Sequence, residues 1–227
     1  MPYNFSFKTV SENDVLKSLN SIKAKSSSGE DGLSTKFIKS IKQEIYQPLT
    51  SLVDQMFTTN IFPDQLKIAK VIPLYKKEDP SLLSNYRPVS ILPALSKVFE
   101  KLIHTKLYNY FESNGILHSH QYGFRKHHST ELASAHVVNT VPTNMDNGFK
   151  TIAIFTDLSK VFDTINHEIL IDKLKHYGLT DSALNLIKSY LTSRKRFVSF
   201  NGMKSYYCTN GCITRFYPWS SAVPYLY

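Results

Sequence analysis

Apolar residues recur at intervals of three and four along the N-terminal part of the chain, which is the spacing of one helix face. Val15 and Leu19 belong to a first predicted helix, VSENDVLKSLNSIKAK, and KSSSGEDG after it predicts a loop. A second apolar stripe runs from Ser34 to about Asn60, and Pro48 is expected to interrupt it. We expect these helices to pack as a pair.

The middle of the chain changes to a strand pattern and then to its clearest helix. LKIAKVIPLYKKED alternates in its first half and ends in charged residues, which predicts a strand that runs out to solvent. SNYRPVSILP is predicted to be extended because of its two prolines. A helix is predicted from Leu95 to Phe111, with Ser96 and Lys97 facing outward and Gly115 closing its C-terminus.

Basic, aromatic and turn-forming residues follow this helix. QYGFRKHHST predicts a loop that leads into a helix from about Thr130 to Thr140. Pro142, Asn147 and Gly148 then predict a turn.

The C-terminal part alternates between strand and helix signals. TIAIFT, residues 151–156, is β-branched and apolar and predicts a buried strand. Helices are predicted at 166–177, closed by Gly178, and at 181–191. Asn201-Gly202 is a strong hairpin signal. Helices and strands alternate without a simple period, so the predicted fold class is mixed α/β, of the α+β kind.

The composition narrows the classes of molecule that the chain is expected to bind. The chain has 227 residues, 42% of them hydrophobic, which is enough for a core. Lys and Arg number 27 against 18 Asp and Glu, a net charge of +9 with a pI of about 9.4, which fits a polyanion. Nucleic acid is the first candidate and an anionic membrane surface the second, while charge kept for solubility explains the same balance.

The same sequence argues against secretion and membrane insertion. Cys208 and Cys212 are too few for a disulfide scaffold and have no nearby histidine for zinc. MPYNFSFKTV lacks a continuous apolar stretch, and no apolar run approaches the roughly 20 residues of a membrane span. We expect an intracellular protein, in the nucleus or cytoplasm. Histidines near the QYGFRKHHST loop lack a fixed ligand spacing and are interpreted as loop residues near a polyanion.

The carboxylate of Asp157 directly follows the predicted strand 151–156, and its position has two possible explanations. Asp157 accepts hydrogen bonds only when ionised, so burial without a donor or metal would cost several kcal/mol. It either caps the following turn through backbone N–H groups or binds a metal ion.

The segment DLSKVFDTINHEIL resembles the first carboxylate motif of reverse transcriptases, in the lineage encoded by non-LTR retrotransposons. KSSSGEDG, AKVIPLYKKEDPSLLSNYRPVSILPALSKVFEKLI and HSHQYGFRKHHST precede it in the order of that family. The resemblance covers roughly residues 5 to 213. It implies the fingers and part of the palm of a right-hand polymerase, and an RNA-directed DNA polymerase activity in the parent protein.

The resemblance assigns metal and sugar contacts to three residues. Asp157 matches the metal-binding aspartate, and the carbonyl oxygen of Leu158 would add a ligand for Mg²⁺, with Mn²⁺ also possible. Phe162 matches the steric gate that excludes a 2′-hydroxyl, although the sequence alone favours an ordinary core aromatic. Asp163 receives no catalytic role.

Basic residues of the fingers-like part are implied to bind phosphate. Lys76, Lys77 and Arg87 match the region that holds the incoming deoxynucleoside triphosphate, but a solvated strand end explains the two lysines as well. Which lysine makes the contact is left open. The resemblance also implies contacts to an RNA template and a DNA primer, with no membrane role, and places them at three residues: Gln121, Phe124 and Arg125.

The family pattern is incomplete, since no two aspartates are adjacent anywhere in the chain and the family's Asp-Asp hairpin and thumb are missing. One DNA string encodes QGSILGPLLFLIY, the family's next motif. Read from two bases later, and with two further bases after its end, it encodes RFYPWSSAVPYLY, which is residues 215–227. We expect a frameshift near Thr214 in an internal fragment of a decayed element.

The sequence is expected to divide into four segments. Residues 1–33 form an N-terminal lead-in, 34–150 a fingers-like region, 151–213 the first part of a palm and 214–227 an out-of-frame tail. The fragment is expected to be inactive alone. The alternatives are a non-catalytic, basic nucleic-acid-binding remnant and a functionless, aggregating relic.

Overall fold

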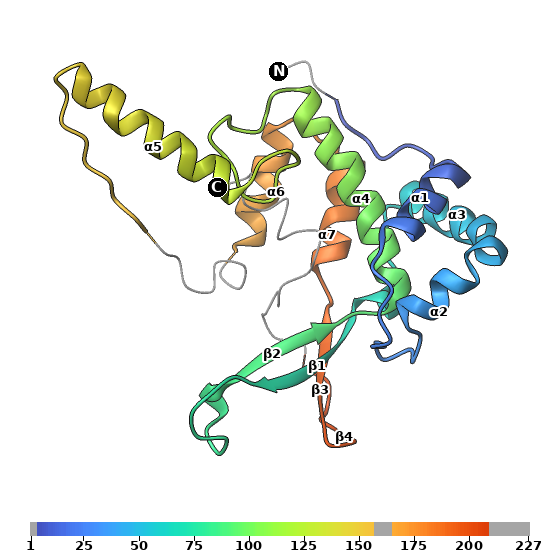
Figure 1. The fold of residues 1–227 in the computed structure, drawn as a ribbon. Coiled ribbons are helices and arrows are strands. Elements are labelled where there is room, and N and C mark those ends of the chain that lie inside the picture. Colours follow the sequence, from blue (N-terminus) through green and yellow to red (C-terminus); the bar gives the residue numbers. More distant parts are fainter. Residues whose placement is uncertain (1–3, 157–164, 209–227) are drawn as a thin grey trace.

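The computed structural model describes residues 4–156 and 165–208, and residues 1–3, 157–164 and 209–227 lie outside the described part. Its regular structure is mainly helical, and the helices surround one main apolar core, with a small sheet at one end (Figure 1). The mixed helix-and-strand class predicted from the sequence is confirmed. The helices are α1 Glu12–Ser21, α2 Thr35–Ser40, α3 Lys42–Thr59, α4 Ala94–Ser113, α5 Thr130–Asp146, α6 His167–His176 and α7 Asp181–Leu191, with 3₁₀ turns η1 Asp64–Lys67 and η2 Leu83–Asn85.

Polar side chains determine where most of these helices begin. Ser11, Ser34, Ser129, Asn166 and Thr180 each accept a hydrogen bond from a backbone N–H in the first turn of the helix that follows. At α1 the neighbouring Asp side chain completes a capping box. These residues satisfy N–H groups that would otherwise have no partner.

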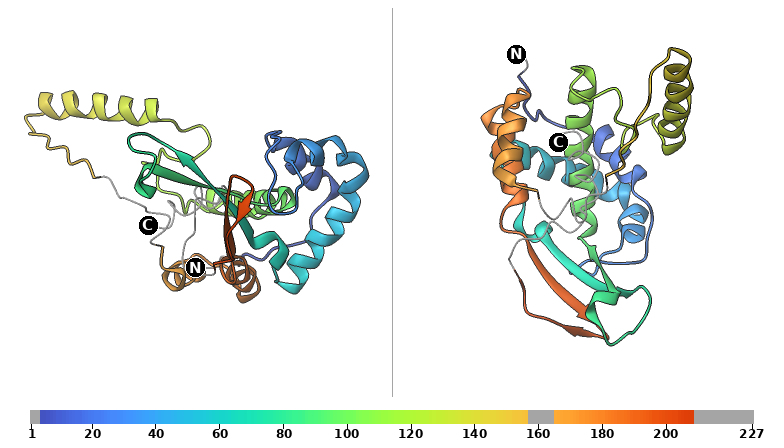
Figure 2. Two further views of the ribbon diagram at one scale, coloured as in Figure 1. Left: turned by 90° about the horizontal axis from the view of Figure 1, so that it is seen from below. Right: turned by 90° about the vertical axis from the view of Figure 1, so that its left-hand side faces the viewer.

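Helix α4 lies at the centre of the main core, as Figure 2 shows. Its predicted apolar stripe is confirmed, since Val98, Leu102 and Leu107 are almost fully buried. The prediction that Ser96 faces outward is wrong, because Ser96 has no exposed surface and donates a hydrogen bond to Glu100 at 3.3 Å. Helix α4 is covered on more than one side, so a helix face that looks polar in the sequence is also buried. Lys97 is half-buried.

The N-terminal segment is joined to the C-terminal helices. The N–H of Phe5 donates to the carbonyl of Gly178 at 2.8 Å, and the N–H of Thr180 donates back to Phe5 at 2.9 Å. The Phe5 ring also packs against Phe7 and Tyr110, at 5.0 and 4.8 Å between ring centroids. Residues near the two ends of the described chain therefore share one core.

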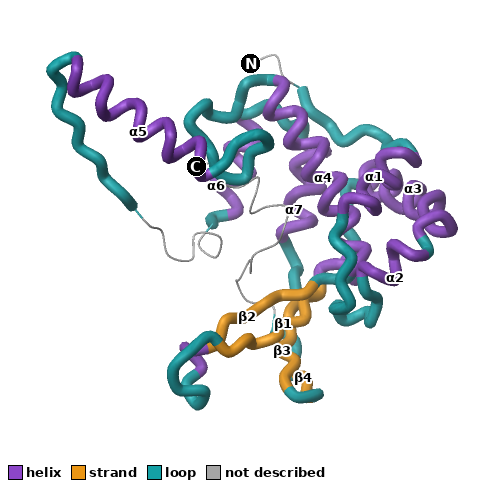
Figure 3. Tube along the Cα trace, in the orientation of Figure 1, coloured by secondary structure: helices purple, strands orange, loops and turns teal. Residues whose placement is uncertain are grey.

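The sheet has four strands in the order β2-β1-β3-β4, and its central strands come from distant parts of the sequence (Figure 3). Strand β1 pairs antiparallel with β2 and parallel with β3. Strands β3 and β4 form the hairpin predicted at Asn201-Gly202, whose φ values of 47° and 80° fit a primed hairpin turn. The strands are β1 Ile68–Tyr75, β2 Tyr86–Ile91, β3 Lys195–Phe200 and β4 Met203–Lys204.

Two prolines lie inside helices where the sequence predicted breaks. Helix α3 continues through Pro48, and the break falls at Ile41, whose ψ of 19° separates α2 from α3. Helix α5 continues through Pro142 to Asp146, six residues beyond the predicted end at Thr140. A proline removes one backbone hydrogen bond, and the neighbouring turns hold both helices together across that gap.

The predicted buried strand at residues 151–156 is wrong. This segment is irregular, and Ile152, Ile154 and Phe155 have exposed fractions of 86%, 83% and 89%. A β-branched run favours a strand only where another strand is available to pair with it, and no described strand lies beside this segment. The segment follows α5, which extends away from the helical core and has no buried residue (Figure 1).

None of the described helices is both long and apolar enough to cross a bilayer.

Candidate nucleotide and nucleic-acid interface

The first candidate surface is the solvent-facing end of the β1–β2 hairpin. Leu74 is the cross-strand partner of Arg87, and the N–H of Lys76 donates to the carbonyl of Asn85 at 2.9 Å just beyond the strand. The pairing register therefore continues to Lys76. The side chains of Lys76, Lys77 and Arg87 are all exposed.

Strand pairing separates the two lysines. Directly opposed residues share a sheet face, and residues two apart along a strand do so as well. Lys76 therefore lies on the face of Leu74 and Arg87, as a diagonal neighbour of the arginine, whereas Lys77 lies in the bend beyond the paired residues. Lys77 forms an ion pair with Glu78 at 3.3 Å. Lys76 and Arg87 are therefore the pair of cations on a shared face that is a candidate for contact with one phosphate group.

The loop that closes this hairpin is held by local contacts. The Tyr75 hydroxyl donates to the carbonyl of Glu78, and the Tyr75 and Tyr86 rings lie 5.7 Å apart at their centroids. Asp79 accepts from the N–H of Ser81 at 2.8 Å, and this hydrogen bond lowers the pKa of the Asp79 carboxyl. These contacts fix the backbone from which the two lysines project.

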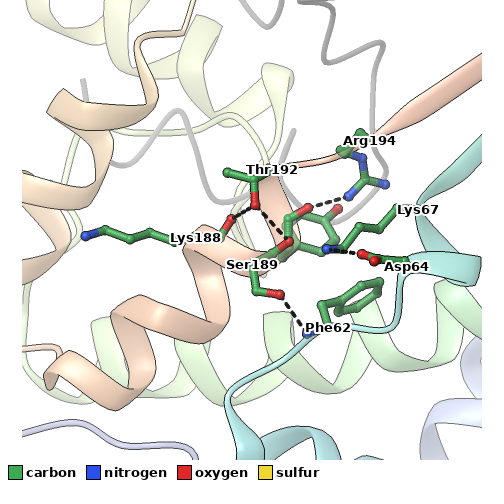
Figure 4. Close-up of polar contacts among 8 residues, drawn as sticks. Phe62, Asp64, Lys67, Lys188, Ser189, Thr192 and Arg194 are labelled. Atoms are coloured by element: carbon green, nitrogen blue, oxygen red, sulfur yellow. Dashed lines mark hydrogen bonds and ion pairs between the residues drawn. The ribbon is translucent and has the colours of Figure 1, made fainter. Parts of the chain in front are cut away.

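The base of the hairpin rests on buried charges that the sequence reading did not identify. Lys67 precedes β1 and Arg194 precedes β3, and the parallel pairing of Ile68 with Lys195 brings the two cations to the same level of the sheet. The Lys67 ammonium is buried and pairs with Asp64 at 2.8 Å, while Arg194 donates to the carbonyl of Tyr190 at 2.9 Å (Figure 4).

Glu100 completes this buried network. It accepts hydrogen bonds from the Tyr190 hydroxyl at 2.8 Å and from Ser96 at 3.3 Å, and an Arg194 nitrogen lies 3.8 Å away. Burial raises the pKa of the Glu100 carboxyl, and the Arg194 charge partly offsets that rise. Burial and the neighbouring carboxylate also raise the pKa of Tyr190 well above its ordinary value. The one sequence signal of this buried network was a Ser and a Glu that lie four residues apart within the apolar stripe of α4.

The second candidate surface is the loop between α4 and α5. Phe124 is exposed, with a left-handed φ of 62°. Arg125 donates to the carbonyl of His118 at 2.9 Å and to Glu112 at 3.1 Å, so this guanidinium shapes the loop. Gln121 is half-buried, and its Nε2 has no hydrogen-bond partner among the described residues. The expected template or primer contacts of these residues stay predictions.

The two candidate surfaces lie at opposite ends of α4. The helix has 20 residues and is therefore about 30 Å long, with the sheet at its N-terminal end and the second loop at its C-terminal end (Figure 1). The structure therefore does not bring the two predicted groups of site residues together.

Three predicted site residues, Asp157, Leu158 and Phe162, lie outside the described residues. Among residues 4–156 and 165–208, no three His, Cys, Asp or Glu side chains come together in a way that could hold a metal ion. Cys208 is a free, exposed thiol.

The protein therefore has an α+β fold with two candidate surfaces for phosphate groups. One is the basic end of the β1–β2 hairpin, and the other is the basic loop after α4. The chain belongs to the reverse transcriptase family, because the family model described as "Reverse transcriptase (RNA-dependent DNA polymerase)" matches residues 75–214. All the site residues predicted from the sequence fall within that match.

Curated relatives place the chain among the polymerases of non-LTR transposons. It is 31% identical over 182 residues to the RNA-directed DNA polymerase from mobile element jockey of Drosophila melanogaster, covering 80% of this chain and 20% of the relative. It is 31% identical over 174 residues to the protein named probable RNA-directed DNA polymerase from transposon X-element of the same species, covering 76% and 19%. The corresponding protein of transposon BS is 28% identical over 198 residues, covering 84% and 21%. The chain spans about a fifth of the length of these relatives.

Proposed function

We propose that this chain is the part of an RNA-directed DNA polymerase that holds the incoming deoxynucleoside triphosphate and the RNA template with its DNA primer. By itself it binds these polyanions without polymerising. The observation that carries the proposal is the register of the β1–β2 hairpin, which puts Lys76 and Arg87 on one exposed face.

Lys76, rather than Lys77, makes the triphosphate contact in this proposal. A guanidinium offers a planar pair of donors to phosphate oxygens, and an ammonium beside it adds a point charge. Lys77 lies in the bend beyond the paired residues and already forms an ion pair with Glu78. Moving Lys77 to the phosphate would break that ion pair.

A divalent cation, Mg²⁺ or Mn²⁺, would neutralise charge on the transferring phosphoryl group. The described residues do not fit such an ion, since they offer no cluster of ligands for it. The ligands expected from the sequence, Asp157 and Leu158, and the expected sugar gate, Phe162, remain predictions outside the described residues.

Binding of a fluorescent deoxynucleoside triphosphate to single-residue variants tests the proposal. Lys76→Ala and Arg87→Ala are each expected to weaken binding about tenfold or more, because each removes a charge-assisted contact of about 1.5–3 kcal/mol. Lys77→Ala is the matched control, with an expected change below about twofold. If Lys76→Ala and Lys77→Ala weakened triphosphate binding equally, the β1–β2 pairing register would not determine which lysine contacts the triphosphate.

Primer extension separates binding from catalysis. We expect the chain to bind an RNA–DNA hybrid with an affinity that falls steeply as salt rises, and to incorporate no nucleotide in the presence of Mg²⁺. Templated incorporation that is lost in Asp157→Ala would instead establish catalysis by this chain.

The exposed apolar segment 151–156 favours the second candidate, an aggregating relic without function. Light scattering of the same samples distinguishes it, because a relic would self-associate without saturable, salt-dependent binding of the hybrid.

A further inference from the structure

A cluster of imidazole and phenol rings lies where the α4–α5 loop meets helix α5. The ring centroids of His118 and His120 are 5.3 Å apart, and those of His120 and His136 are 5.0 Å apart. Tyr122 joins the cluster at 6.1 Å from His136 and 5.8 Å from His128. The three histidines His118, His120 and His136 are exposed.

Hydrogen bonds fix the protonation of some of these rings and leave others able to gain a proton. Nδ1 of His118 accepts from the N–H of His120 at 3.2 Å, so His118 carries its proton on Nε2. Nδ1 of His128 lies 2.9 Å from the carbonyl of Lys126, which can only accept, so Nδ1 carries the proton and Nε2 can gain one. The ring nitrogens of His120 and His136 have no hydrogen bond to another described residue.

Charged and titratable groups surround the cluster. The Arg125 guanidinium donates to the carbonyl of His118 and is paired with Glu112 at 3.1 Å. The Lys126 ammonium lies 5.3 Å from the centroid of the Tyr108 ring. Two imidazolium ions about 5 Å apart would repel each other. The charged and titratable groups on the three elements that meet here include His104, Tyr108 and Glu112 of α4, Arg125, Lys126 and His127 of the loop, and Glu131 of α5.

We propose that the ring cluster around His120 and His136 is a proton-linked nucleic-acid-binding surface, which becomes positively charged as phosphate groups approach it. The inference rests on the proposed function and names its second contact surface. A phosphate strand adds negative charge beside the rings, so binding takes up protons. Exposed rings at this spacing also offer flat surfaces on which bases can stack.

The position of the cluster fits a nucleic acid that reaches both candidate surfaces. It lies at the C-terminal end of α4, about one helix length, or about 30 Å, from the sheet end. A nucleic acid that contacts both the cluster and the end of the hairpin must therefore be an extended one.

Fluorescence anisotropy with a labelled RNA–DNA hybrid at pH 8 and pH 6, at constant salt, tests the inference. An imidazole whose pKa rises on binding from about 6.5 to about 7.5 strengthens binding about sixfold between these two pH values. The wild-type chain is expected to bind at least about sixfold more tightly at pH 6, and about 35-fold if His120 and His136 both respond.

The ratio of the affinity at pH 6 to the affinity at pH 8 is expected to be at least about sixfold smaller for the double variant His120→Gln/His136→Gln than for wild type. Its affinity at pH 8 should stay within about twofold of wild type. His176→Gln is the matched control, since His176 is exposed and also contacts a tyrosine ring, at 5.9 Å, but lies on α6. The control is expected to keep the full pH response.

Each other outcome is decisive. Saturable binding that does not change with pH overturns the proton linkage and leaves the proposed function intact. A pH response that survives in the double variant assigns the protons to other groups and also overturns the inference. A chain that binds no hybrid at either pH refutes both the inference and the proposed function.

Discussion

Replacing Tyr190 with phenylalanine probes the buried network beneath the hairpin. The substitution keeps the ring, which packs edge-on against Phe62 at 5.0 Å between centroids, and removes only the hydroxyl. That hydroxyl donates to Glu100 at 2.8 Å, and each of the two residues is 1% exposed. Water therefore cannot take the place of the lost donor.

The expected loss of stability follows from the charge of the acceptor. A hydrogen bond to a charged group contributes about 1.5–3 kcal/mol, against about 0.5–1.5 kcal/mol for a neutral pair. Glu100 Oε2 has no hydrogen-bond partner among the described residues, so the Tyr190 hydroxyl is the closest donor to a carboxylate that is already poorly solvated. We expect Tyr190→Phe to lower the free energy of unfolding by about 2 kcal/mol at pH 8.

The loss should shrink as the pH falls. Burial raises the pKa of Glu100 above its ordinary value of 4.5, so the folded protein binds this proton more tightly than the unfolded chain does. Wild-type stability from this group therefore falls as pH rises through the window between 4.5 and the raised pKa. The Tyr190 hydroxyl favours the ionised form, so its removal raises the pKa further and costs most above that window.

Urea unfolding followed by circular dichroism measures the effect. With a slope of about 2–3 kcal/mol/M, a loss of about 2 kcal/mol lowers the midpoint by about 0.7–1 M. Tyr46→Phe is the control for removal of a hydroxyl, because Tyr46 is half-buried and its hydroxyl bonds no described residue. Tyr110→Phe is the control for charge, because its hydroxyl donates to the neutral carbonyl of Tyr177 at 2.6 Å and its loss should not depend on pH.

Two results would refute this reasoning. A Tyr190→Phe loss no larger than that of Tyr46→Phe would mean that Glu100 gains nothing from the hydroxyl. A loss that stays constant between pH 8 and pH 5 would mean that the charge of Glu100 does not change over that range, contrary to the expected decline.

Two further predictions concern backbone contact and reading frame. Gly29→Ala should lower the free energy of unfolding by about 1–3 kcal/mol, because its Cβ would lie 2.8 Å from the backbone nitrogen of Pro93. Gly123→Ala, which meets nothing within 4 Å, should change stability by less than about 0.5 kcal/mol, and equal thermal shifts of the two variants would contradict the contact. Sequencing of the coding DNA around Thr214 should recover QGSILGPLLFLIY in another frame, and its absence would reject the proposed frameshift.

The phosphate-binding role of Lys76, Lys77 and Arg87 stays a prediction from the motifs around β1 and β2. Those motifs left open which lysine makes the contact. The cross-strand register favours Lys76, because it fixes which side chains share a face with Arg87. The histidine cluster depends in the same way on α5 returning His136 to the loop that carries His120.

The sequence by itself determined the elements whose signals are local. The periodic stripe of α4, the caps of α1, α6 and α7 and the Asn201-Gly202 turn depend on residues a few positions apart, and the family depends on motifs read along the chain. Only the tertiary structure decided which polar groups are buried and which apolar groups are exposed. Glu100 is buried because α7, 90 residues away, supplies its hydroxyl donor, and residues 151–156 are exposed because no described strand pairs with them. Burial and strand pairing depend on partners distant in the sequence, so no local pattern encodes them.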